Sequence, residues 1–159
     1  MKKTLLGIAS IVILLSACEK EKVIFEKKYD LTNATWQHAD TLNFAFDIAD
    51  TTSLYDLSMT VSHKTDYGFQ NIYTQIYTQF PSGLRSKQLL NLDLSDNMGK
   101  WNGTGSGNTR QFQVNIQQNA FFNQVGKHVI TLEQFMRTDA LVGIENITLK
   151  IIDKQIKRQ

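Results

Sequence analysis

Cysteine, excess charge and long apolar runs are all scarce in this chain of 159 residues. The single cysteine, Cys18, excludes an intramolecular disulfide. The longest apolar segment, residues 5–15, falls well short of the roughly 20 residues that span a bilayer as a helix. With 17 basic and 15 acidic residues, the charge balance gives no indication of nucleic-acid binding.

The first 18 residues are arranged in the order that is typical of an export signal. Lys2 and Lys3 precede the apolar run, and the small residues Ser16 and Ala17 separate that run from Cys18. This arrangement resembles the bacterial lipobox, in which the cysteine thiol takes a diacylglycerol and cleavage falls directly before it. The alternative is an ordinary buried cysteine after an apolar segment. We therefore predict a lipoprotein signal peptide over residues 1–17 and lipidation, including palmitate-type acylation, at Cys18.

Cleavage at that point defines the rest of the domain organisation. Removing 17 of the 159 residues leaves 142, enough for one domain with its own core. We expect a lipid-anchored tether over residues 18–28, a folded domain over 29–153 and a polar tail over 154–159. The signal removes Lys2 and Lys3 and no acid, so the mature chain carries no formal net charge. Its membrane attachment must come from the lipid, whose two acyl chains anchor stably.

Apolar and polar residues alternate along most of the domain, which is typical of strands with one buried and one wet face. Residues 42–48 and 55–61 show the pattern most clearly, and residues 50–53 read as their connection. Further expected strands are 71–80, 90–94, 112–116, 127–135 and 147–151. Residues 133–140 could hold one helical turn.

Seven short strands separated by turn signals indicate an all-β fold with a single domain. We predict an antiparallel β-sandwich, either immunoglobulin-like or a jelly roll. The predicted core contains alternating apolar side chains of three strands: Leu42, Phe44, Phe46, Leu57, Met59, Val61, Phe112 and Val114.

Motifs for catalysis, metals and cofactors do not emerge from the sequence. His38, His63 and His128 are not at metal-ligand spacings, and no Gly-x-Ser-x-Gly elbow occurs. An EF-hand beginning at Asp93 fails at its sixth and twelfth positions. The glycines of residues 103–107 lack the lysine of a phosphate-binding loop and favour a flexible hairpin connection. We therefore predict a protein that is not an enzyme and has no cofactor or metal.

Aromatic residues provide the one candidate binding site. Trp36, Trp101, Tyr73 and Tyr77 could form a platform on which sugar rings stack, although aromatics in a sandwich more often pack in its core.

The mature chain resembles GldH, a family of gliding-motility-associated lipoproteins of the Bacteroidota. The resemblance runs in order through most of the domain. It is carried by Tyr29-Asp30-Leu31, Asn33-Ala34, Trp36, Asp40-Thr41-Leu42, Phe44, Phe46, Ile48, Tyr55-Asp56-Leu57, Asp66-Tyr67, Asn71-Ile72-Tyr73, Phe80-Pro81-Ser82-Gly83, Gly99-Lys100-Trp101, Gly103 to Gly107, Met136-Arg137, Asp139, Leu141, Gly143-Ile144 and Leu149. Ala140 departs from the pattern, where a proline would be expected.

The resemblance implies a non-enzymatic lipoprotein of the cell envelope, associated with the gliding machinery and with the secretion system tied to it. Its partners would be other envelope motility or secretion proteins and, through the lipid, the membrane. A lipid-anchored glycan-binding module is the alternative. We expect attachment to the outer membrane, with the periplasmic face favoured because the segment Glu19 to Lys22 alternates in charge and forms no acidic export tag.

Overall fold

The computed structural model describes residues 21–159, which fold into ten strands and one short 3-10 turn. The strands are β1 (Lys22–Asp30), β2 (Thr35–Gln37), β3 (Leu42–Ile48), β4 (Ser53–Lys64), β5 (Asn71–Gln79), β6 (Arg85–Asp93), β7 (Thr109–Ala120), β8 (Gly126–Gln134), β9 (Ala140–Val142) and β10 (Ile144–Lys157). The 3-10 turn covers Thr32–Ala34. No helix within residues 21–159 is long and apolar enough to cross a membrane. The predictions for residues 1–17 and Cys18 lie outside the described residues.

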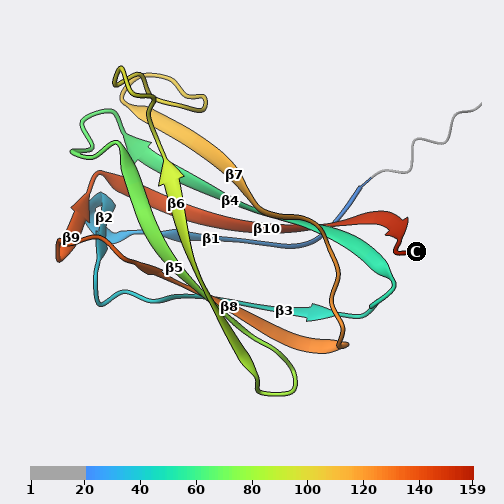
Figure 1. The fold of residues 1–159 in the computed structure, drawn as a ribbon. Coiled ribbons are helices and arrows are strands. Elements are labelled where there is room, and N and C mark those ends of the chain that lie inside the picture. The colour runs from blue at the N-terminus through green and yellow to red at the C-terminus, as the bar shows by residue number, and fades with distance from the viewer. Residues whose placement is uncertain (1–20) are drawn as a thin grey trace, which may run out of the picture.

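Two antiparallel sheets of four strands pack face to face, as the sequence predicts (Figure 1). The first has the order β1-β10-β4-β7, and the second has the order β3-β8-β5-β6. Most consecutive strands therefore lie in opposite sheets, and β5 and β6 form a hairpin within one sheet. This order is that of a jelly roll rather than an immunoglobulin-like sandwich, whose sheets have the orders ABED and CFG. The short strands β2 and β9 pair with each other beside these sheets.

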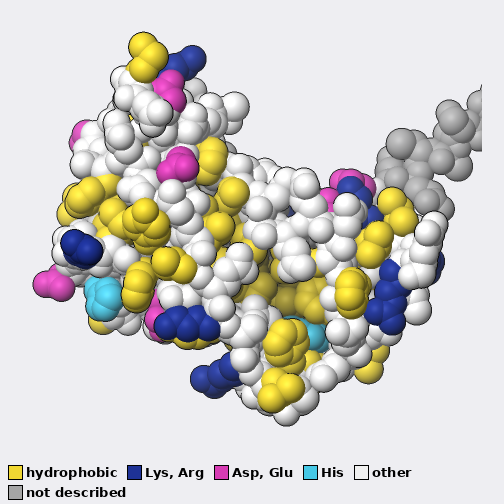
Figure 2. Space-filling view, viewed as in Figure 1, with side chains coloured by type: hydrophobic (Ala, Val, Ile, Leu, Met, Phe, Trp, Pro, Cys, Tyr) yellow, Lys and Arg dark blue, Asp and Glu magenta, His cyan; other side chains and the backbone are white. Residues whose placement is uncertain are grey.

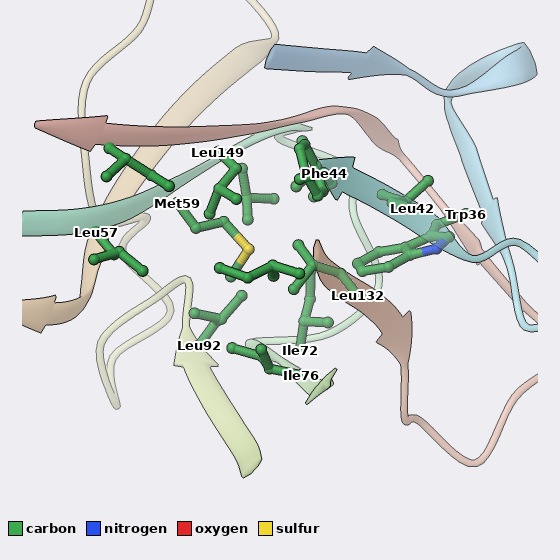
Figure 3. Close-up of a cluster of buried hydrophobic side chains, with 14 of the residues drawn as sticks. Trp36, Leu42, Phe44, Leu57, Met59, Ile72, Ile76, Leu92, Leu132 and Leu149 are labelled. Atoms are coloured by element: carbon green, nitrogen blue, oxygen red, sulfur yellow. The ribbon is translucent and has the colours of Figure 1, made fainter. Parts of the chain in front are cut away.

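The core lies between the facing sheets, and its side chains come from both of them (Figure 3). Burial alternates at every residue of β3, so the period-two pattern translates directly into an inner and an outer face. The predicted core residues on β3 and β4 are all buried. Phe112 and Val114 are only partly buried, because β7 is an edge strand and no neighbour covers its free side.

The first strand, β1, begins at Lys22 and so lies largely within the segment expected to be a tether. Charged residues interrupt the alternation of apolar and polar residues along β1. Lys27, for example, stands at a position that pairs with the buried Leu149 of β10. The Lys27 ammonium nevertheless finds partners there: its Nζ lies 3.1 Å from the carbonyl oxygen of Asn43 and 4.2 Å from the centre of the Tyr29 ring. A lysine on an edge strand also discourages pairing with other chains.

Two further segments differ from expectation. Residues 133–140 contain no helical turn, because β8 continues to Gln134 and the chain then bends before β9 begins at Ala140. The strand β10 continues to Lys157, through most of the segment expected to be a polar tail. This last part of β10 still belongs to the sheet, where Lys157 pairs with Ser53 of β4.

The register of β1 defines two ends of the sandwich. Lys22 pairs with Asp153 at one end, and Asp30 pairs with Asn146 at the other. We call the first the anchor end, because the chain enters there from the N-terminus, and the second the distal end. The eight residue steps of β1 separate these ends by about 26 Å.

Candidate functional site

A groove at the distal end gathers apolar side chains that the core does not cover. We call it the apolar groove, and its cavity of about 530 Å³ is lined by Phe69, Tyr73, Leu89, Phe135, Met136, Arg137 and Thr138. Its large side chains Phe69, Tyr73, Leu89 and Phe135 are between 40 and 51% exposed. Figure 2 shows apolar side chains gathered in the left part of the view, over the end where β5 begins. Contiguous exposed apolar surface of this kind typically marks a binding site.

Backbone and side-chain hydrogen bonds fix the segment that forms one wall of the groove. The amide of Phe135 donates to the Tyr73 carbonyl over 2.7 Å, which extends the sheet past the end of β8. The buried Gln134 side chain accepts from the amide of Met136 and donates to the carbonyl of Thr138, at 2.8 and 2.9 Å. This wall is therefore ordered before any partner arrives, which lowers the entropy cost of binding.

The opposite wall begins in the loop between β4 and β5. The buried Tyr67 supports Phe69, with ring centres 5.6 Å apart, and its hydroxyl donates to the Asn71 carbonyl. Burial raises the pKa of the Tyr67 phenol well above its usual value, so this support stays neutral over the physiological range. Gly143 touches Tyr67 on its other side, where an added Cβ would approach to 3.3 Å.

The four aromatic residues predicted to stack on sugars do not form one platform. Trp36 is fully buried in the core, where its indole Nε1 donates to the Asp40 carbonyl, so the prediction that it stacks on a ligand is wrong. Trp101 is partly buried against His63 and lies in a different pocket from Tyr73. Tyr77 lines a separate cavity of about 230 Å³. Tyr73 is the one of the four that lies in the apolar groove.

The histidines are likewise dispersed. His63 and His128 are fully buried, and each has its Nδ1 on a backbone carbonyl and its Nε2 without a partner. Desolvation lowers the pKa of His63. His128 lies instead among the rings of Phe46, Phe80 and Phe122. No group of metal-binding side chains occurs within residues 21–159.

The remaining loop motifs have structural roles. The Asp96 carboxylate accepts from the amides of Met98 and Lys100, both at 2.9 Å, and so closes a turn. Thr104 bridges to Gln111, which brings Gly103 and Gly105 against the backbone of β7. The glycine-rich segment is thus a closely packed connection, in which a Cβ at Gly103 would lie 2.1 Å from the Gln111 oxygen.

Sequence reasoning missed most of the apolar groove. Leu89 and Leu90 are adjacent, so one of them must face outward, and this break in alternation was the available signal. Phe69 and Phe135 lie outside regular strands, where periodicity carries no information about exposure.

These features define an all-β jelly-roll domain with an exposed apolar groove at its distal end. The chain belongs to the GldH lipoprotein family, whose model matches residues 23–151. This confirms the resemblance found in the sequence and makes the protein a lipoprotein of a gliding-motility family of the Bacteroidota. The family is not a known enzyme family.

Two relatives extend over nearly the same length. The chain is 29% identical over 141 residues to the gliding motility lipoprotein GldH homolog of Christiangramia forsetii, covering 86% of this chain and 85% of that protein. It is 24% identical over 149 residues to the gliding motility lipoprotein GldH of Flavobacterium johnsoniae, covering 89% and 91%.

The similarity of this chain to solved structures is weaker. Dimeric latent PorU from Porphyromonas gingivalis aligns with a TM-score of 0.38 and 11% identity, over 84% of this chain and 13% of that one. A family 35 carbohydrate binding module from Clostridium thermocellum aligns with a TM-score of 0.29 and 12% identity, over 77% and 97%.

Proposed function

We propose that the protein is a lipid-anchored, non-enzymatic component of the envelope machinery for gliding motility, and that its apolar groove holds an apolar segment of a partner protein of that machinery. The observation that carries the proposal is the convergence of exposed apolar side chains from β5, β6 and two loops on one ordered groove. Membership of the GldH lipoprotein family supplies the cellular context. The secretion system tied to gliding is a second source of partners.

The position of the groove relative to the anchor supports this role. Cys18 precedes the start of β1 by four residues, which span at most about 14 Å when fully extended. The anchor end is thereby held close to the bilayer, whereas the groove lies at the distal end. A partner within the envelope can reach the groove without competing with the membrane.

Co-purification from the native host tests the docking role. We expect tagged protein carrying Leu89→Ser or Phe135→Ser to lose envelope motility proteins that the unmodified protein retains after cross-linking. Met98→Ser is the matched control, because Met98 is 93% exposed at the same end but outside the groove. Retention of every partner by both groove variants would show that the groove is not the docking surface.

The supporting residue Gln134 offers a second test. Gln134→Ala leaves the groove side chains in place but removes the hydrogen bonds that order residues 136–138. We expect weaker partner capture together with faster amide exchange at Met136. Unchanged exchange at Met136 would contradict the assigned role of Gln134.

Glycan binding is the second candidate function, supported by one specific observation. Tyr73 also borders a polar cleft of about 600 Å³ that contains Asn71, Asn91 and Asp93. A sugar ring stacked on Tyr73 could reach those groups. Glycan binding that Tyr73→Ala abolishes and Leu89→Ser preserves would favour this function over protein docking.

We further propose that the lipid inserts into the outer membrane on its periplasmic face. The neutral segment after Cys18 and the need for partners inside the envelope support this orientation. Proteinase treatment of intact cells should leave the domain intact, along with a periplasmic control protein. Digestion of the domain while that control survives would place it on the cell surface.

A further inference from the structure

A second set of exposed apolar side chains lies at the anchor end, well away from the apolar groove. We call Leu84, Phe121 and Val125 the apolar loop tips, and they are between 52 and 68% exposed. Leu84 belongs to the turn between β5 and β6, and the other two belong to the loop between β7 and β8. Both loops are in the lower right part of Figure 1.

Specific contacts hold these two loops together. The amide of Ser82 donates to the Gln124 side chain over 3.0 Å, and Pro81 lies against Gly126 at 3.7 Å from the position of an added Cβ. Beneath them, Phe122 is buried against Tyr55 and Phe46. The loop between β7 and β8 thus has one phenylalanine seated in the core while its neighbour Phe121 faces outward.

The C-terminal strand connects the loop tips to the point where the chain enters from its N-terminus. Lys22 pairs with Asp153 of β10, and a few residues further on Arg158 lies over the Phe121 ring at 5.1 Å. Arg158 also donates to Asn123 of the same loop. The apolar loop tips are therefore on the end of the sandwich that the short N-terminal segment tethers.

We propose that the apolar loop tips contact the lipid bilayer and insert into its interface. This inference rests on the proposed lipid anchor, because the anchor holds this end of the domain at the membrane. Insertion there buries apolar surface at little entropic cost, since the anchor has already confined the domain. It fixes the tilt of the sandwich and directs the apolar groove away from the membrane.

Two lysines at this end are already engaged by carboxylates, which favours an apolar contact over an electrostatic one. Lys154 is paired with Glu21 and Asp56, and Lys157 is paired with Asp50. These pairings offset two of the positive charges at this end, whereas Lys127, two residues from Val125, is exposed. Arg158 lies at the level of Phe121, where its guanidinium can meet lipid phosphates as the ring enters the interface.

Depth-sensitive fluorescence on the lipidated mature protein tests the proposal. The native thiol is consumed by the lipid, so Val125→Cys or Leu84→Cys introduces one free thiol for an NBD label. The protein is reconstituted into phosphatidylcholine vesicles with and without bromine-labelled acyl chains. We expect both labels to shift to the blue and to lose most of their emission to bromine quenching, whether or not phosphatidylglycerol is added.

Met98→Cys is the matched control, because its exposed side chain lies at the distal end and its label should keep the emission it has in water. Flotation of the vesicles reports anchoring separately from insertion. Protein that floats but shows unquenched, water-like labels at Val125 and Leu84 would overturn the insertion while leaving the anchor in place. Failure to float would instead refute the lipid anchor on which the inference rests. Quenching that appears only with phosphatidylglycerol would overturn the apolar mechanism.

Discussion

At the scale of single residues, the protein depends on side chains that join its two sheets at their borders and fill the space between them. Tyr29 shows both roles, because its ring meets Phe44 edge-on at 5.0 Å and its hydroxyl donates to the Asn43 carbonyl of the other sheet. One side chain of an edge strand thus contributes packing and a hydrogen bond across the border of the sandwich.

Phe44 is fully buried on the inner face of β3, and its replacement tests the core directly. We expect Phe44→Ala to lower the free energy of unfolding by about 3–5 kcal/mol, because it removes buried surface and leaves a cavity. Urea denaturation followed by circular dichroism measures the change. Met98→Ala, at an exposed position, should change it by no more than about 0.5 kcal/mol. Equal effects of the two substitutions would contradict the assigned core.

His63 links stability to pH. Its pKa is lowered from the ordinary value of 6.5 mainly by desolvation, which outweighs its hydrogen bond with the Lys64 carbonyl; Arg110 also lowers it and Glu145 raises it. Below pH 6.5 the unfolded chain therefore takes up a proton that the folded chain resists. We therefore expect His63 to leave the free energy of unfolding undiminished above pH 6.5 and to lower it progressively as the pH falls below 6.5.

Substitution separates His63 from the other titrating groups. His63→Gln should flatten the decline in unfolding free energy between about pH 6.5 and 5, even if it lowers stability at neutral pH. His38→Gln, at an exposed position, is the matched histidine substitution with which the change in slope is compared. An identical slope in wild-type protein and His63→Gln would contradict the role of His63.

At the scale of elements, close backbone approach decides which loops tolerate change. Gly103 and Gly107 both have positive φ, at 81° and 59°, but Gly103 lies against β7 whereas Gly107 faces open space. Substitutions at these two glycines therefore separate the free-energy cost of the left-handed backbone conformation from the cost of a steric clash.

We expect Gly107→Ala to destabilise the protein by about 1 kcal/mol, the cost of a left-handed conformation. Gly103→Ala carries the same cost and also forces a Cβ against the Gln111 carbonyl, so it should cost about 1–3 kcal/mol more. Thermal unfolding of both variants measures the difference. Equal stability of the two would mean that the segment 103–107 is not packed on β7 in solution.

The alternating strands were largely predictable from the sequence, since side-chain direction along a strand is a local property with a period of two. The residues of β3 and β4 illustrate this, because their expected core positions are all buried. Strand β1 was not predictable in the same way, since its Lys27 is held by the Tyr29 hydroxyl and by the Asn43 carbonyl of the other sheet, a contact that only the packed sandwich provides. The candidate site was missed for the same reason: Phe69 and Phe135 come to line one groove only after β5 pairs with β8.

At the scale of the whole molecule, the separation between the proposed anchor and the groove is the main consequence of the fold. The register of β1 with β10 places the start of β1, which follows the proposed lipidation site in the chain, at the end of the sandwich opposite the groove. A lipoprotein built in this way can remain fixed to a membrane at one end and bind at the other, which fits the proposed role in an envelope assembly.

The proposed anchor depends on one atom, the thiol of Cys18. We expect Cys18→Ala to block labelling by a clickable fatty acid and to leave the protein either uncleaved or released from the membrane. Cys18→Ser is the closest match in size and should behave in the same way, because the hydroxyl does not replace the thiol as acceptor. Mass spectrometry that finds an unmodified Cys18 in protein from the envelope fraction would contradict lipidation.

The sequence by itself determined seven of the strands, the two-faced character of the clearest ones and the lipobox-like order of residues before Cys18, because each of these depends on neighbouring residues. Only the tertiary structure decided between the immunoglobulin-like and jelly-roll orders, since strand pairing joins residues far apart in the chain. It also decided that Trp36 is a core residue and Tyr73 a groove residue. Both are large aromatics in similar polar surroundings along the chain, and their exposure depends on which strands and loops fold over them.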